Sequence, residues 1–107
     1  MKNKLQGTWE IIETDMWDKE SLDMEDTAVI SFNDQNQGEL SFVAIESWID
    51  YRFDKQDNLI EFSFEGTDAG RPICGRGKAT FTNDQILGTL FIHNGDESTF
   101  KAKRLPS

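Results

Sequence analysis

The sequence predicts an all-β domain of about eight antiparallel strands, arranged as an up-and-down meander and closed into a small barrel of the lipocalin or streptavidin kind. Apolar and polar residues alternate repeatedly along the chain, whereas no window of a dozen residues keeps the apolar spacing of an amphipathic helix. Short turn signals separate the alternating segments, so successive strands are expected to pair directly. A length of 107 residues suits one core, and we expect a single domain over residues 1–107.

The expected strands follow from the alternation, in order along the chain. They cover residues 6–14, 27–32, 38–45, 47–54, 58–65, 75–82, 85–93 and 97–104. Turn signals stand at residues 33–38, residues 54–58, Asn83-Asp84 and Asn94-Gly95. The Asn-Gly pair lies between two alternating segments and is the strongest hairpin signal in the chain.

Two expected connections are longer than a hairpin turn. The first runs from Asp15 to Asp26, is acidic, and is expected to hold one helical turn around Ser21 to Glu25. The second runs from Gly66 to Cys74 and is rich in glycine, which predicts a wide, flexible turn.

Each expected strand has one apolar face, and seven of the eight phenylalanines fall on it. The residues expected to face the interior are Trp9, Ile11, Ala28, Ile30, Phe32, Leu40, Phe42, Ala44, Ile49, Tyr51, Phe53, Ile60, Phe62, Phe64, Gly77, Ala79, Phe81, Ile86, Leu90, Ile92, Phe100 and Ala102. Closing the meander into a barrel hides this face and removes both sheet edges, although an open sheet folded into a sandwich satisfies the same pattern. The rings are expected to fill a small barrel, which disfavours a large lipid pocket.

The charge of −9 is unevenly distributed. Residues 5–68 hold 17 acids and 3 bases, whereas residues 69–107 hold 3 acids and 6 bases. An acidic chain repels phosphate backbones, so we expect no nucleic acid partner, while a basic protein partner is compatible with this charge.

The start of the chain and its cysteine content indicate the expected location. Cys74 is the only cysteine, which excludes an internal disulfide, and the first residues lack the apolar core of a signal peptide. No stretch approaches the roughly 20 apolar residues of a membrane-spanning helix. We therefore expect a cytoplasmic protein with no membrane partner.

A short motif links the first and last expected strands. Gly7-Thr8-Trp9, with Arg104 on the same face, resembles the Gly-x-Trp and closing arginine of the lipocalin and wider calycin barrels. This resemblance implies that Arg104 stacks over Trp9 and fixes the closure of the barrel.

A second resemblance covers nearly the whole chain. The segments that carry it are Met16-Trp17-Asp18, Ile49-Asp50-Tyr51-Arg52, Ile60-Glu61-Phe62-Ser63-Phe64-Glu65-Gly66, Gly75-Arg76-Gly77 and Ile92-His93-Asn94-Gly95-Asp96-Glu97-Ser98. They are similar to the pattern of a family of small uncharacterised bacterial proteins. The resemblance implies a bacterial, cytosolic, stand-alone domain, and it brings no catalytic residue with it.

One candidate site lies where alternate connections of a meander meet, at one end of the barrel. The residues expected to gather there as a small-ligand site are Trp17, Trp48, Glu65, Asp68, Arg71, Arg76, His93 and Asp96. Tryptophan supplies a stacking wall, while arginine and histidine supply polar anchors. The alternative is a set of solvated loops with ordinary ion pairs.

The only histidine, His93, would have to carry any acid or base chemistry near neutral pH, with Asp96 or Glu65 orienting its ring. No nucleophile and base stand in a recognisable arrangement, so we do not expect an enzyme. No spacing of histidine and carboxylates indicates a metal site, and no cofactor is expected.

The outward face of the expected strands retains more apolar residues than scattered exposure requires. These are Ile12, Val29, Val43, Ile45, Trp48, Leu87 and Phe91. Strands one to four supply most of them, so they are expected to form one patch. A homodimer or docking to another protein is therefore the leading functional hypothesis, ahead of the small-ligand site.

Overall fold

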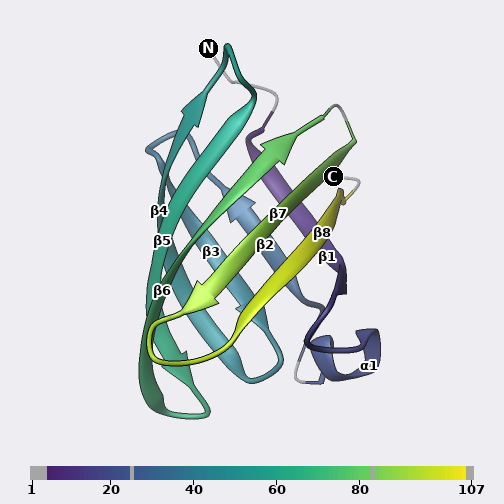
Figure 1. Ribbon diagram of the computed structural model, residues 1–107, viewed down its shortest axis with the longest axis vertical. Coiled ribbons are helices and arrows are strands. Elements are labelled where there is room, and N and C mark those ends of the chain that lie inside the picture. The colour runs from purple at the N-terminus through teal and green to yellow at the C-terminus, as the bar shows by residue number, and fades with distance from the viewer. Residues whose placement is uncertain (1–4, 25, 83, 106–107) are drawn as a thin grey trace.

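The computed structural model describes residues 5–24, 26–82 and 84–105, and its strands form a closed antiparallel barrel in chain order (Figure 1). The strands are β1 (Gly7–Thr14), β2 (Val29–Phe32), β3 (Gln37–Phe42), β4 (Ile45–Asp54), β5 (Leu59–Asp68), β6 (Arg71–Phe81), β7 (Gln85–Ile92) and β8 (Glu97–Arg104), with the short helix α1 (Lys19–Leu22) between β1 and β2. The predicted eight-stranded barrel is confirmed, and the sandwich alternative is wrong. Glu25 of the expected helical turn and Asn83 of an expected turn lie outside the described residues.

Closure depends on the pairing of β1 with β8. Trp9 lies opposite Arg104 and Ile11 opposite Ala102, after which the register shifts between Ile11 and Glu13. This β-bulge leaves Ile12 without a partner on β8 and adds local twist. Because β1 also pairs with β2, every strand of the described barrel has a paired neighbour on both sides.

Alternate residues of every strand point into the barrel, as the period of two predicts. Seven phenylalanines are buried or half-buried against the core and make ring contacts across it, as expected. Ring centroids lie 5.6 Å apart for Trp9 and Phe81, and 6.2 Å apart for Phe62 and Phe100. The edge-to-face geometry of these pairs is the one that aromatic quadrupoles favour.

Two glycines of β6 make room for phenylalanines of β5. Gly75 pairs with Phe64 and Gly77 with Phe62. A Cβ atom at Gly77 would lie 2.4 Å from Phe62 Cζ, and one at Gly75 would lie 2.5 Å from Phe64 Cζ. The ring of each phenylalanine therefore covers the glycine beside it, which explains glycine inside a long strand.

The wide turn expected from Gly66 to Cys74 is wrong. β5 and β6 continue through this segment to a two-residue turn at Ala69-Gly70, where both residues have positive φ angles (50° and 89°). Such a turn matches the twist of antiparallel strands. Gly66 serves close packing instead, since a Cβ there would lie 2.0 Å from the backbone oxygen of Glu46.

The break expected at Glu46 is also misplaced, because the turn between β3 and β4 lies at Val43-Ala44. Ala44 is therefore a half-buried turn residue and not an interior strand residue. Ile45 is only 3% exposed and faces the core, so its assignment to the outer face is wrong. Val43 has a φ of 55°, rare for a β-branched residue, and packs partly buried against the core.

The segment around α1, residues 15–24, covers the end of the barrel at which the β3–β4 turn lies (Figure 1). Leu22 is fully buried, and its carbonyl oxygen accepts a hydrogen bond of 2.8 Å from the Val43 backbone N–H. Trp17 packs on Phe42 with ring centroids 5.1 Å apart. The Asp18 carboxylate caps the helix by accepting from the Ser21 N–H at 2.8 Å.

Polar contacts fix this segment to the strands. Lys19 Nζ donates to Glu10 Oε2 at 2.7 Å and to Asp23 Oδ1 at 3.0 Å. The Asp15 carboxylate accepts from Ser98 Oγ at 2.6 Å and from the Thr99 N–H at 2.9 Å. The segment around α1 is thus tied to β1 by Lys19 and to β8 by Asp15.

The opposite end is closed by the first and last strands. The Arg104 guanidinium lies 4.3 Å from the centre of the Trp9 ring, as the closure motif predicted. Trp9 Nε1 donates to the Leu5 carbonyl oxygen at 2.9 Å, and Arg104 Nη1 donates to the Gln6 carbonyl oxygen at 3.1 Å. The described part of the chain contains no helix with the length and apolarity needed to cross a membrane.

Candidate functional site

The candidate site lies on the outer side of the barrel wall, at the exposed indole of Trp48. The register places Glu39 of β3 and Glu65 of β5 directly beside Trp48 of β4. Glu46 and Asp50 lie two residues before and after Trp48, so they point to the same side of the sheet. We call these five residues the Trp48 face.

The Trp48 face is unpaired and accessible. Trp48 is 68% exposed, more than any other large apolar residue in the described part of the chain. Its four carboxylates are exposed, and none has a cationic partner within 4.0 Å among the described residues. Four negative charges thus surround an uncovered indole.

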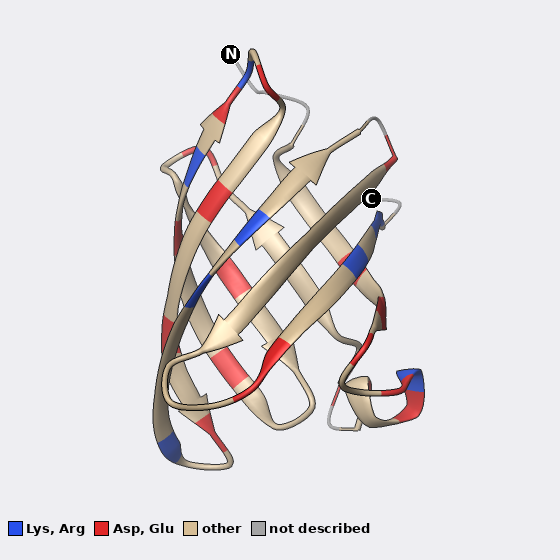
Figure 2. Cartoon of the chain, in the orientation of Figure 1, with Lys and Arg blue, Asp and Glu red and all other residues tan. Residues whose placement is uncertain are grey.

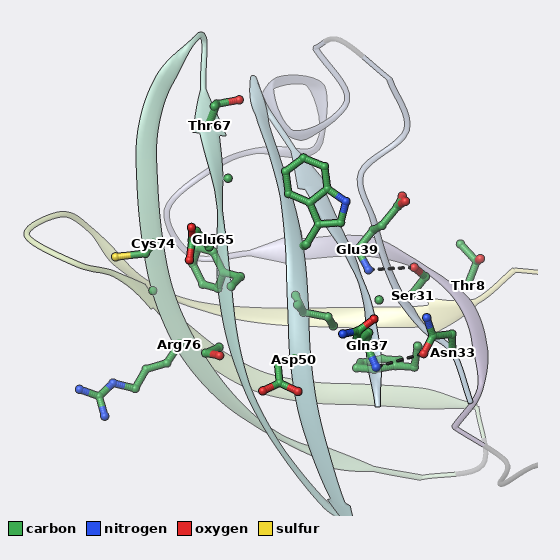
Figure 3. A pocket seen from close by; sticks show the side chains of 18 of the residues that line it. Thr8, Ser31, Asn33, Gln37, Glu39, Asp50, Glu65, Thr67, Cys74 and Arg76 are labelled. Atoms are coloured by element: carbon green, nitrogen blue, oxygen red, sulfur yellow. Dashed lines mark hydrogen bonds between the residues drawn. The ribbon is translucent and has the colours of Figure 1, made fainter. Parts of the chain in front are cut away.

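Four residues of this face, Glu39, Trp48, Asp50 and Glu65, line an open depression of about 1260 Å³ that reaches from β1 to β7 (Figure 3). Polar side chains line it, among them Ser31, Asn33 and Gln37 at one side and Thr67 and Cys74 at the other. The Ser31 hydroxyl accepts a hydrogen bond of 3.1 Å from the Glu39 backbone N–H, which ties β2 to β3 beside the site. The depression is therefore a broad, open surface on a wall of paired strands.

Arg76 stands at the border of this depression. Its guanidinium lies 5.2 Å from the centre of the Phe91 ring on β7, and in Figure 3 its side chain points away from Asp50 and Glu65. The nearest cation thus stacks on a ring of its own and leaves the carboxylates of the Trp48 face unneutralised.

The structure brings together four of the eight residues expected to form a ligand site at the long-loop end. Trp48, Glu65, Arg76 and His93 do line one depression, but it lies on the side of the barrel. Trp17 is half-buried on Phe42 and belongs to the closing segment. The remaining three predicted residues, Asp68, Arg71 and Asp96, lie in or beside the tight turns after β5 and β7 and do not line the depression.

His93 is exposed in the turn between β7 and β8, with its backbone N–H bonded to the Cys74 carbonyl oxygen at 2.7 Å. Among the described residues, its ring makes no hydrogen bond to Asp96 or Glu65. No group of three or more histidine, cysteine, aspartate or glutamate side chains in the described ranges has the arrangement of a metal site. The structure thus gives no support to acid–base chemistry at His93.

The apolar outer residues do not form one patch. Ile45 faces the core, and Val43 packs against it. Ile12, Val29 and Phe91 are half-buried on three different strands, and Leu87 is 46% exposed on β7. Trp48 and Leu87 are therefore isolated exposed apolar residues, with β5 and β6 between their strands.

The shifted ionisable groups lie at the α1 end and not on the Trp48 face. Hydrogen bonds from Ser98 and Thr99 hold the pKa of Asp15 below its ordinary value, and the helix cap at Ser21 lowers the pKa of Asp18. The Ala28 N–H, and then Lys19, lower the pKa of Asp23. Burial alone would lower the pKa of Lys19, but the carboxylates of Glu10 and Asp23 outweigh it and raise that pKa.

Sequence reasoning found Trp48 and Glu65 but missed the other three acids of the face. Glu46 and Asp50 stand two residues from Trp48 in the sequence, so the alternation alone could have grouped them. Glu39 joins them only through the register of β3 with β4, which the misplaced turn at Glu46 obscured.

Comparisons of the chain with protein-family models, with curated proteins and with solved structures find no match. Both resemblances stated from the sequence therefore stay predictions, and the function has to be argued from the site itself.

Proposed function

We propose that this protein is an interaction module whose Trp48 face binds a basic surface of a partner protein. The observation that carries the proposal is the position of Trp48, 68% exposed between Glu39 and Glu65 of the two neighbouring strands. Tryptophan is one of the residues that most often dominate binding at protein interfaces.

Arginine and lysine are the side chains that this face suits best. A cation over an indole gains about 0.5–2 kcal/mol, depending on how far it is desolvated. The guanidinium of arginine can stack on the ring and donate to a carboxylate in the same plane, which lysine cannot do with equal geometry. The four surrounding carboxylates also raise the local concentration of a basic partner and speed its association.

The closed barrel restricts how a partner can bind. Every described strand pairs with a neighbour on each side. The stretches left without a paired strand are short, such as residues 52–54 of β4 towards β3 and residues 71–73 of β6 towards β7, so little free edge is available for an additional strand from a partner. Recognition has to use side chains on the barrel wall, and the Trp48 face offers the largest exposed one.

The shape of the site favours a protein over a small molecule. Small-ligand sites bury most of the ligand in a concave, largely apolar pocket. The depression around Trp48 is open and lined by many polar residues, so it would leave a small ligand mostly in water. A protein segment laid across the wall would cover it.

The test is isothermal titration with short peptides. We expect a peptide of alternating arginine and glycine to bind, and the same peptide with glutamate for arginine to give no heat. Trp48→Ala should weaken binding at least tenfold, about 1.4 kcal/mol, and Glu39→Gln with Glu65→Gln should reduce both the affinity and its salt dependence.

A matched control removes two exposed acids elsewhere. Glu20→Gln with Asp57→Asn changes the net charge equally but lies on α1 and in the β4–β5 turn. If this control weakens binding as much as the Glu39 and Glu65 pair, attraction to the whole chain explains the binding and the proposal is wrong. Binding that survives Trp48→Ala at full strength would also reject it.

A further inference from the structure

The charge asymmetry of the sequence becomes a spatial one because the strands follow one another around the barrel. Acids predominate on β1 to β5, while most bases of the chain lie on β6 and β8. β7 carries no charged residue and lies between those two strands, as Figure 2 shows by its lack of coloured bands. One side of the wall is therefore basic with an uncharged centre.

Leu87 stands in that centre. It is 46% exposed and lies directly opposite Lys101 of β8. Lys103 lies opposite Gln85, and Lys78 lies opposite Thr89. These two residues stand two positions before and after Leu87 on the same face of β7. Each of the three lysines also lies opposite a glutamate of its other neighbouring strand, Lys78 opposite Glu61, Lys101 opposite Glu13 and Lys103 opposite Glu10, but none forms an ion pair within 4.0 Å among the described residues. We call Lys78, Leu87, Lys101 and Lys103 the Leu87 face.

The Trp48 face and the Leu87 face carry opposite charges, and each has an exposed apolar residue at its centre. The Trp48 face has four carboxylates around an exposed indole, and the Leu87 face has three lysines around an exposed leucine. The other large apolar residues exposed in the described ranges, Met16 and Met24, both lie in the segment around α1. Within one molecule the faces cannot meet, because β5 and β6 hold them apart in a closed ring.

We infer that the Leu87 face of one copy of this chain docks on the Trp48 face of a second copy. The inference rests on the proposed function, since it assigns a partner to the same Trp48 face. At physiological ionic strength charges are screened over about 8 Å, so the overall charge of −9 acts on the contact mainly through the residues close to it. Because the contact joins two different faces, each added copy leaves one of each kind free.

The test is the mass of the particle in sedimentation velocity across a range of concentrations. For the unmodified chain we expect the mass to rise beyond a dimer as concentration increases. Trp48→Lys and Leu87→Glu should each remain monomeric, because each places a repelling charge at the centre of one face. Met24→Lys, a matched change of an exposed apolar residue on neither face, should behave like the unmodified chain.

Mixing the two variants gives the decisive result. Trp48→Lys keeps an intact Leu87 face and Leu87→Glu keeps an intact Trp48 face, so an equal mixture should form dimers and nothing larger. Glu65→Lys and Lys101→Glu repeat the test through charge alone, and circular dichroism checks that every variant is folded. A mixture that stays monomeric overturns the inference, and so does a dimer of Leu87→Glu alone, which would mean a symmetric contact.

The outcome also separates this inference from the proposed function. The Leu87→Glu variant should still bind the arginine peptide, and the peptide should dissociate the assemblies of the unmodified chain. If the unmodified chain stays monomeric at the highest concentration while the peptide binds, only the self-association is wrong. If the peptide does not bind either, the Trp48 face is not an interaction site.

Discussion

The two ends of the barrel are closed by different kinds of contact. At one end, the segment around α1 is tied to β1 and β8 by ionised side chains, chiefly Asp15, Lys19 and Asp23, over the buried Leu22. At the other end, Trp9 is fully buried, packs on Phe81 and is covered by Arg104. The first closure depends on carboxylates and their hydrogen bonds, and the second on packing and a cation over an aromatic ring.

This difference means that the ends can be weakened separately. Trp9 belongs to the aromatic core that the strands enclose, so its loss should destabilise the whole barrel. The segment around α1 lies over strands that pair without it, so it can open while the barrel stays folded.

The largest effect is expected for Trp9→Ala. Removing a fully buried indole from the core costs about 3–5 kcal/mol of unfolding free energy, measured by urea denaturation. Trp17→Ala is the same change at the other end, where the indole is only half-buried, and should cost less than half as much. Equal losses would contradict the distinction between the ends.

A smaller effect is expected for Leu22→Ala. Leu22 is the last residue of α1 and its side chain is fully buried, so its truncation should cost about 2–3 kcal/mol. The loss should be local, so amide exchange of Val43, whose N–H donates to the Leu22 oxygen, should accelerate well before that of the β5–β6 pairs. Uniform acceleration would show that the segment is an integral part of the core.

Arg104→Gln should cost about 1 kcal/mol, because it removes the cation over the Trp9 ring. Lys103→Gln removes the same charge from the preceding residue, which is exposed, and should leave the unfolding free energy nearly unchanged. Comparing the two denaturation midpoints isolates the stacking contact from the change in net charge.

The smallest effect is expected from acid. The pKa values of Asp15, Asp18 and Asp23 are lowered from 3.8, so each carboxylate stabilises the native structure above that pH and ceases to do so as the pH falls below it. The Val43 amide resonance in NMR should therefore shift at acid pH before the signals of Trp9 and Ala102 change. Asp15→Asn should show part of this shift already at neutral pH.

The interior of the barrel was predictable because alternation is a local signal. Each inward phenylalanine could be assigned from its neighbours two residues away, and the assignments that failed, Val43, Ala44 and Ile45, lie at the misplaced turn. The Trp9–Arg104 contact was predictable because a short motif carried it.

The turns failed where glycine and valine had uncommon roles. Gly66 and Gly70 suggested a wide, flexible turn, but Gly66 is a strand residue that leaves room for a neighbouring backbone, and Gly70 lies in a two-residue turn. Val43 gave no turn signal, because valine is not a typical turn residue. It adopts its positive φ in the β3–β4 turn, where its own N–H donates to the Leu22 carbonyl oxygen. Such contacts between distant segments cannot be read from local sequence.

The candidate site was only partly predictable because it depends on register. Which residues stand beside Trp48 is decided by the pairing of β3, β4 and β5, and a shift of the turn by two or three residues changes the answer. The four carboxylates are ordinary surface residues until the strands bring them together.

The pairing of β1 with β8 has a consequence for how the protein is made. Arg104 bonds to Gln6 across 98 residues of sequence, while the other strands pair with the strand just before them. During synthesis, β1 and β7 therefore keep unsatisfied edges until β8 has left the ribosome. The nascent chain is most exposed to aggregation in that interval, and completing the ring ends it.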